Sequence, residues 1–174
     1  MIKNIFEINA IFHKVTNWKN KKKKLVNVLK HYPEVKEKHF STNKSKPRNQ
    51  IYTFVQDILR EDFNAIANEV NMTMHINEIW SVTYNKFNFH NPHNHGLKGF
   101  SGILFIDYKP TDHEPPYFVC PFNNPFTGKS MISSPNVEEG DILITPSYLM
   151  HYTNVNTSSK PRRILGFDFE FEEI

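Results

Sequence analysis

Residues 141–171 read DILITPSYLMHYTNVNTSSKPRRILGFDFEF, and this stretch decides the fold class. Two runs rich in Ile, Leu and Phe, at 141–146 and 163–171, are separated by a segment that contains Asn, Thr, Ser and Pro. Short β-prone runs between such turn residues are typical of strands joined by turns. The end of the chain is therefore expected to be built from strands.

The strand pattern extends upstream through residues 76–84 (INEIWSVTY) and 101–108 (SGILFIDY). The segments between these runs are rich in Pro, Asn, Gly and Ser, which are the residues that turns require. From residue 76 onward the chain therefore predicts a β-barrel or β-sandwich.

The N-terminal part of the chain has a different pattern. Residues 2–12 are β-prone and predict a short strand. Apolar residues then recur at helical spacing over 18–31, where Asn17 could cap the first turn, and again over 50–71. The polar segment 41–49 contains a proline and predicts a loop between the two helices. Helices of this kind pack as one layer on the outside of a sheet.

The length of 174 residues fits one domain with one core. We expect an α+β organisation in which residues 1–75 form an N-terminal strand and helical support and residues 76–174 form the barrel core. Apolar residues make up 39% of the chain, which excludes a disordered tail, and no apolar run is long enough to cross a membrane. The single cysteine, Cys120, cannot form an internal disulfide and fits a cytoplasmic location.

Positive charge is concentrated between Lys14 and Arg48. This segment holds twelve Lys or Arg residues against Glu34 and Glu37, a net charge of +10, so the rest of the chain carries −7. The lysine run 21–24 could contact phosphates or another anionic partner. A solvated helix face is the more common reason for such a run. Because no basic motif with interleaved aromatic residues is present, we expect no nucleic-acid partner.

Three histidines, His90, His93 and His95, lie within six positions. His93 and His95 are two residues apart, so on a strand both side chains project from one face and could bind one metal ion. Such a pair needs a third ligand, and His151, just after the apolar strand 141–146, is the natural candidate. The alternative for His151 is a core histidine held by hydrogen bonds. His90 would face another way, behind the ligands or on the surface.

A second feature is an arginine in the last strand. Alternation places Arg163 on the apolar face of 163–171 and Arg162 on the other face, where it should matter little. The residues expected to be buried with Arg163 are Leu165, Phe167 and Phe169, and those expected to be exposed are Asp168 and Glu170. A buried guanidinium needs a partner, and its planar fork suits a carboxylate. That carboxylate could belong to a small ligand beside the metal or to an internal salt bridge.

The chemistry-bearing residues follow one another in a fixed order: His93-x-His95, the strand 101–106, the segment 140–151 and Arg163. This ordered set resembles the 2-oxoglutarate/Fe(II)-dependent oxygenases and is most similar to the small oxygenases of bacteria and marine phages. The resemblance covers residues 76–171. It implies a double-stranded β-helix, or jelly roll, with the helices outside.

The resemblance also implies cofactors and roles. Fe(II) and 2-oxoglutarate would be the cofactors, with His93 and His151 as metal ligands. Arg163 matches the basic residue that pairs with the distal carboxylate of 2-oxoglutarate, and Tyr84 matches a tyrosine that lines the cosubstrate pocket in many relatives. The segment 109–136 is expected to be a loop that covers the mouth of the site.

Two positions depart from the family pattern. His95 stands where relatives have a carboxylate ligand, so the metal site has three histidines, or it takes a carboxylate from elsewhere, or catalysis is lost. Zinc also accepts three histidines and a water. Leu165 stands where relatives often have a serine, two residues after the arginine, which helps to hold the cosubstrate.

Three functional hypotheses follow. The first is an oxygenase that uses Fe(II), O2 and 2-oxoglutarate to oxidise a substrate that the sequence does not identify. The second is a cupin-like metal enzyme with the ligands His93, His95 and His151 that does not use 2-oxoglutarate. The third is a non-catalytic barrel used for binding or assembly. Conversion of 2-oxoglutarate to succinate separates the first hypothesis from the second, and tight metal retention separates the second from the third.

Overall fold

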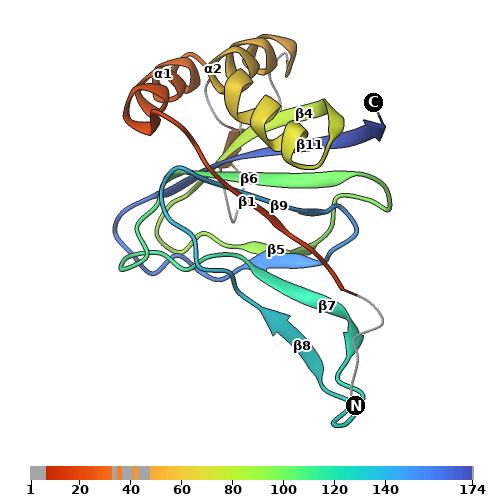
Figure 1. Ribbon diagram of the computed structural model, residues 1–174. Helices are drawn as coiled ribbons and strands as arrows, with labels where there is room; N and C mark the ends of the chain where they lie inside the picture. The colour runs from red at the N-terminus through yellow and green to blue at the C-terminus, as the bar shows by residue number, and fades with distance from the viewer. Residues whose placement is uncertain (1–6, 33–34, 37–40, 43–47, 174) are drawn as a thin grey trace.

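The computed structural model describes residues 7–32, 35–36, 41–42 and 48–173 (Figure 1). It contains two β-sheets whose paired strands are all antiparallel. The larger sheet has seven strands, in the order β1 (Ile11–Lys14), β9 (Asp141–Pro146), β6 (Phe100–Asp107), β11 (Arg162–Glu173), β4 (Met72–Tyr84), β3 (Ser41–Thr42) and β2 (Val35–Lys36). The smaller sheet has four strands, in the order β5 (His90–His93), β10 (His151–Thr153), β7 (Tyr117–Asn123) and β8 (Ser130–Ser133).

Both helices cover the outer face of the larger sheet, and the smaller sheet lies below the inner face (Figure 1). They are α1 (Trp18–Lys30) and α2 (Arg48–Glu69). One stripe of α2 is fully buried, formed by Ile51, Val55, Leu59 and Ile66. This spacing of four and seven residues keeps the apolar side chains on one side of a helix. The predicted order, helices first and then a barrel of two sheets, is confirmed.

Two apolar cores result, one on each face of the larger sheet. The outer core lies between the sheet and the helices, where Phe63 of α2 meets Phe167 of β11 edge to face, with ring centroids 5.4 Å apart. The inner core lies between the two sheets and includes Trp80, Tyr84 and Phe118. Because the central strands are covered on both faces, neither face of β11 is left in water.

The faces of β11 are the reverse of the sequence-based assignment. Leu165, Phe167 and Phe169 are buried as predicted, but they face the helices. The opposite face points between the sheets, and its residues include Arg162 and Asp168. Gly166 belongs to that face, where a Cβ atom would lie 2.5 Å from the Trp80 ring. The expectation that Asp168 and Glu170 are exposed is therefore wrong, since both are partly buried. Alternation identified two faces, but apolar character could not tell the helix side from the barrel side.

Several predicted boundaries need correction. The N-terminal strand is at Ile11–Lys14 instead of 2–12, and residues 1–6 lie outside the described part of the chain. Asn17 precedes α1, but its side chain accepts a hydrogen bond from the Asn20 side chain and caps no backbone group. Its backbone is left-handed, with φ of 50°. A cap requires the extended backbone that this conformation lacks.

Two segments expected to be loops contain strands. Ser41 and Thr42 pair with β4, and α2 already begins at Arg48, so the predicted loop 41–49 is shorter, with 43–47 outside the described residues. The segment 109–136 holds β7 and β8, which pair with each other. None of the described helices is long and apolar enough to cross a membrane.

Candidate metal and cosubstrate site

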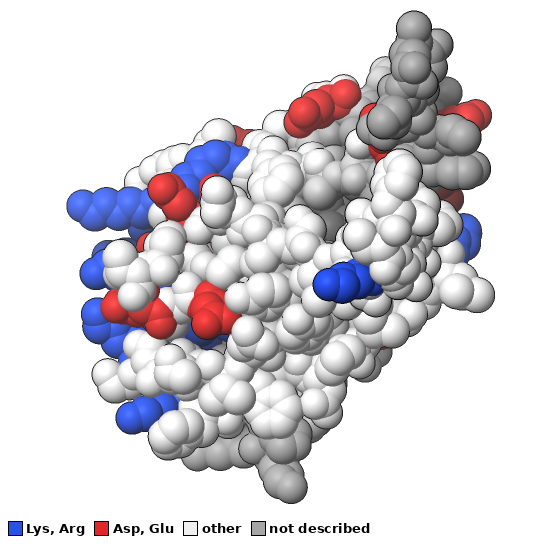
Figure 2. All heavy atoms as spheres, turned by 90° about the horizontal axis from the view of Figure 1, so that it is seen from below, with Lys and Arg blue, Asp and Glu red and all other residues white. Residues whose placement is uncertain are grey.

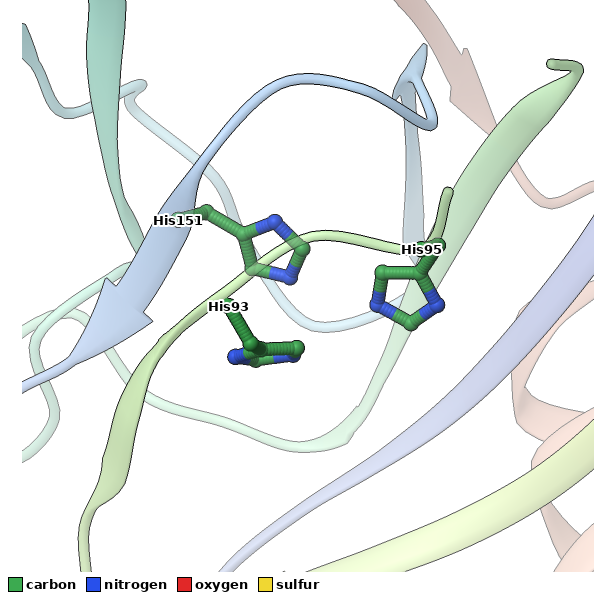
Figure 3. A group of neighbouring side chains, drawn as sticks. All are labelled: His93, His95 and His151. Carbon is green, nitrogen blue, oxygen red and sulfur yellow. The ribbon is translucent and has the colours of Figure 1, made fainter. Parts of the chain in front are cut away.

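Three histidines converge between the two sheets at one end of the smaller sheet (Figure 3). β5 ends at His93, His95 follows in the next turn, and β10 begins at His151. His93 and His151 are register partners, with imidazole centroids 4.4 Å apart. One nitrogen from each ring lies within 4.8 Å of the other two. The residues predicted as metal ligands are therefore brought together, although His95 lies beyond the strand and not on it.

The three imidazoles share one feature, an oxygen acceptor opposite Nδ1. The acceptors are the Asn91 carbonyl for His93 (2.8 Å), the Leu149 carbonyl for His151 (3.2 Å) and the Asp168 carboxylate for His95 (3.2 Å). Because carbonyl and carboxylate oxygens only accept, each Nδ1 is the donor, and Nε2 is the atom of each ring that is left to bind a metal ion. Metal-ligating histidines in proteins are oriented in this way.

His151 is 6% exposed, and this burial has an electrostatic consequence. Burial, together with the charge of the neighbouring His93, lowers the pKa of His151 to about 4. The imidazole is therefore neutral near pH 7. A histidine must be neutral to bind a metal ion, so the surroundings prepare His151 for ligation.

His95 lies between an aromatic wall and the other histidines. Its ring stacks on Trp80 at 5.4 Å and lies parallel to the ring of His151 at 5.2 Å. Asp168 of β11 contacts Nδ1 on the far side of the ring. Among the described residues, the group that could hold a metal contains the three histidines and no carboxylate. Three neutral nitrogen donors fit iron(II) or zinc, and Asp168 supplies a negative charge one residue further out.

A small cavity of about 80 Å³ adjoins the histidines, and Tyr84 forms part of its wall. Tyr84 is 1% exposed, and its hydroxyl lies 3.1 Å from Nδ1 of His90. Burial raises the pKa of the Tyr84 phenol, so the hydroxyl stays protonated at neutral pH. The ring of His90 stacks on that of His93 at 4.0 Å, so His90 lies beside the candidate ligands. Tyr84 therefore lies beside the candidate metal ligands, and its contact with a cosubstrate stays a prediction.

Arg163 does not point into this space. Its side chain is 28% exposed, with Nε donating to Thr83 Oγ1 and Nη1 lying 3.6 Å from the Asp107 carboxylate. No hairpin brings it close to His151 either, since β10 and β11 belong to different sheets. The inward orientation predicted for Arg163 is therefore wrong, and the internal salt bridge is the arrangement found.

Arg162 is the arginine that is buried between the sheets. It is 3% exposed and lies over the Tyr84 ring, with its guanidinium carbon 4.3 Å from the ring centroid. Nη1 donates to the Glu114 carbonyl at 2.6 Å, whereas Nε and Nη2 have no hydrogen-bond partner among the described residues. Asp168 lies on the same face of β11 as Arg162. The occurrence of Arg162 and Asp168 at alternating positions of one strand was the sequence signal that could have identified Arg162 as the inward arginine.

Sequence comparison now places the chain. Residues 78–168, more than half of its length, match the model of a family described as "Putative 2OG-Fe(II) oxygenase". The chain belongs to this family. The family uses Fe(II) and 2-oxoglutarate, which agrees with the resemblance noted in the sequence. Among curated protein sequences, none matches the chain.

Solved structures of 2-oxoglutarate oxygenases share the fold at low sequence identity. HygX from Streptomyces hygroscopicus, solved with nickel, 2-oxoglutarate and hygromycin B, has a TM-score of 0.68 and 12% identity, covering 94% of this chain and 83% of that one. An oxidoreductase of the 2OG-Fe(II) oxygenase family from Burkholderia pseudomallei has a TM-score of 0.65 and 11% identity, and the match covers 92% of this chain and 84% of that one. A prolyl-4-hydroxylase from Pseudomonas putida has a TM-score of 0.56 and 13% identity, and the match covers 95% of this chain and 94% of that one. The predicted double-stranded β-helix with N-terminal helices is thus confirmed.

Proposed function

We propose that this chain is an active Fe(II)- and 2-oxoglutarate-dependent oxygenase whose metal ion is held by His93, His95 and His151. The observation that carries the proposal is the pairing of three oriented imidazoles with a buried guanidinium that keeps two unused donors. The metal and cosubstrate, when bound, would supply the oxidation of a C–H bond by O2, with release of succinate and carbon dioxide. The protein holds and orients the reactants.

Arg162 takes the role that the sequence gave to Arg163. Its Nε and Nη2 form one edge of the guanidinium fork, and a carboxylate can bind such an edge through two parallel hydrogen bonds. Tyr84, which packs under the guanidinium, also lines the cavity beside the histidines. A dicarboxylate bound at the histidines would therefore lie against Tyr84, whose ring also contacts the Arg162 guanidinium.

The residue two positions after Arg162 supplies no hydrogen bond to the cosubstrate. Ile164, two residues further on, belongs to the same face of β11 and lines the cavity beside the histidines. Relatives often have a serine at this position relative to the arginine, and its hydroxyl would assist in binding the carboxylate. An isoleucine cannot donate a hydrogen bond, so Arg162 and Tyr84 provide the polar contacts.

The test is an anaerobic metal analysis followed by turnover of 2-oxoglutarate to succinate. The wild-type protein should retain iron and form succinate, and His151→Ala should lose both properties. His75→Ala is the matched control, because His75 is half exposed and pairs with Glu172 on β11 instead of lying at the site. Tight binding of zinc without any use of 2-oxoglutarate would contradict the proposal and favour a three-histidine zinc enzyme.

A further inference from the structure

β1 and β8 are the edge strands of the two sheets, on the side away from β5 (Figure 1). A cleft of about 350 Å³ opens there. Its walls come from the segment before and within β1, from the inner face of β9, and from β7 and β8. The side chains that define its character are Ile8, Phe12, Phe118, Met131, Leu143 and Leu149. Pockets that hold small molecules in proteins begin at about this size.

Among the residues that the structure describes, none that lines the cleft is charged. Its polar groups are few and uncharged, such as the side chains of Asn9, Ser133 and Thr145. At the rim, Phe12 is 52% exposed and Ile132 is 55% exposed. Figure 2 views the molecule from the side of β7 and β8 and shows a face made mostly of uncharged residues, with Lys and Arg gathered toward one margin. A charged ligand would lose its hydration in the cleft without gaining a partner.

The cleft and the metal centre share a wall. Phe118 of β7 is the register partner of His151, and the two rings lie 5.5 Å apart. Leu149 offers its side chain to the cleft and its carbonyl oxygen to Nδ1 of His151. On the larger sheet, Thr145 lines the cleft and its register partner Ser101 lines the cavity at the histidines. A ligand in the cleft would therefore lie one side chain away from the histidines.

We propose that this cleft binds the apolar, uncharged part of the organic substrate and thereby holds that molecule beside the metal centre. The inference rests on the proposed oxygenase function. The substrate class is a small molecule with an aliphatic or aromatic portion that fills the cleft. Any charged group of that molecule stays in water beyond the rim formed by Phe12 and Ile132.

The probe is N-phenyl-1-naphthylamine, an uncharged fluorophore whose emission rises in apolar surroundings. It should bind the wild-type protein at least about tenfold more tightly than 8-anilino-1-naphthalenesulfonate, which has the same rings and a negative charge. Ser133→Trp fills the cleft and should weaken probe binding by at least about tenfold. Ser130→Trp is the control, since Ser130 is an exposed serine on the same strand that does not line the cleft.

Cys120 gives an independent readout of where the probe binds. It lines the cleft and is the single cysteine of the chain, so bound probe should slow its alkylation by a maleimide. Equal binding of the probe to both tryptophan variants, or binding that leaves the alkylation rate unchanged, overturns the inference. So does a wild-type dimer that Ser133→Trp dissociates, because the cleft would then be covered by a second copy of the chain.

Titration of 2-oxoglutarate into the same iron-loaded proteins separates the two proposals. Both tryptophan variants should bind 2-oxoglutarate as the wild type does, because neither serine lies at the histidines or at Arg162. Absence of probe binding with normal 2-oxoglutarate binding overturns the substrate assignment alone. Normal probe binding without any iron or 2-oxoglutarate binding overturns the proposed function, and the substrate assignment with it.

Discussion

Lys21 and Arg162 are both buried cations, and their surroundings differ. Lys21, on α1, is 8% exposed, and its ammonium group donates to the Asp62 carboxylate at 2.7 Å and to Thr16 Oγ1 at 3.0 Å. Glu61 lies 3.4 Å away as a further acceptor. Arg162, between the sheets, is 3% exposed and has one carbonyl acceptor, with two of its three nitrogens unused among the described residues.

The two cations differ in whether the fold itself supplies their hydrogen-bond acceptors. A buried charge is tolerated when it is paired and hydrogen-bonded, as Lys21 is, and it then helps to fix how α1 and α2 pack. A buried charge without a partner costs free energy that the fold must supply from elsewhere. Such a cost is typical of sites that a ligand completes. The cation on the helix side of the larger sheet is therefore paired within the fold, whereas the cation on the barrel side keeps two donors without a partner among the described residues.

The largest expected effect concerns stability. Lys21→Met leaves the Asp62 carboxylate buried without its cation and should lower the free energy of unfolding by about 3–5 kcal/mol. Arg162→Met removes a charge that has one neutral acceptor, and it keeps an apolar stem over Tyr84. It should change the free energy of unfolding by less than about 1 kcal/mol or raise it. Urea unfolding of the metal-free proteins measures both values. Equal losses in the two variants would remove the distinction between the two cations.

A smaller effect is expected at the metal centre. Asp168→Ala removes the acceptor that orients His95, and loss of such a partner costs about 10- to 100-fold in metal affinity. Glu170→Ala is the control, because Glu170 shares the strand and the face but pairs with Lys98. Anaerobic competition with a chelator gives both affinities. A wild-type affinity in Asp168→Ala would show that His95 needs no support or is not a ligand.

The smallest effect is a pH dependence that belongs to the Lys21 cluster. Burial alone would raise the pKa of the Asp62 carboxyl, but hydrogen bonds from Lys21, His13 and Thr16 lower it below its ordinary value. The unfolded chain therefore binds more protons near pH 4, and the stability that Asp62 contributes is lost as the pH falls from there through the folded-state pKa. Asp62→Asn should show a flatter decline of unfolding free energy over that acid range. Parallel curves for the two proteins would contradict the assignment.

Much of the fold and part of the site follow from sequence patterns. The stripe of α2 and the alternation in β4, β6 and β9 are local signals, and they predicted the elements correctly. The convergence of His93 and His151 was predicted from the His-x-His spacing at His93 and from the place of His151 just after the apolar strand 141–146. The orientation of β11 could not be predicted, because Phe167 on one face and Ile164 on the other are equally apolar and both faces of that strand are buried. The one-residue choice between Arg162 and Arg163 depended on that orientation.

The contact between His95 and Asp168 could not be predicted from the sequence either. The two residues are 73 positions apart, and their contact depends on the packing of the β5–β6 turn against β11. An acidic residue in an alternating strand is ordinarily assigned to solvent, which is why Asp168 was expected to be exposed. Arg162 and Asp168 both contradict a surface assignment, and both lie on the face of β11 that points between the sheets.

The most direct test of the role of Arg162 is calorimetric titration of 2-oxoglutarate into the anaerobic, iron-loaded protein and two arginine variants. A charge-assisted pair of hydrogen bonds in a buried site is worth about 1.5–3 kcal/mol, so Arg162→Met should weaken binding by at least about tenfold. Arg163→Met, one residue away on the outer face, should bind within about twofold of the wild type, because its partners are Asp107 and Thr83. Wild-type affinity in Arg162→Met, or a loss confined to Arg163→Met, would contradict the assignment of the buried guanidinium to the cosubstrate.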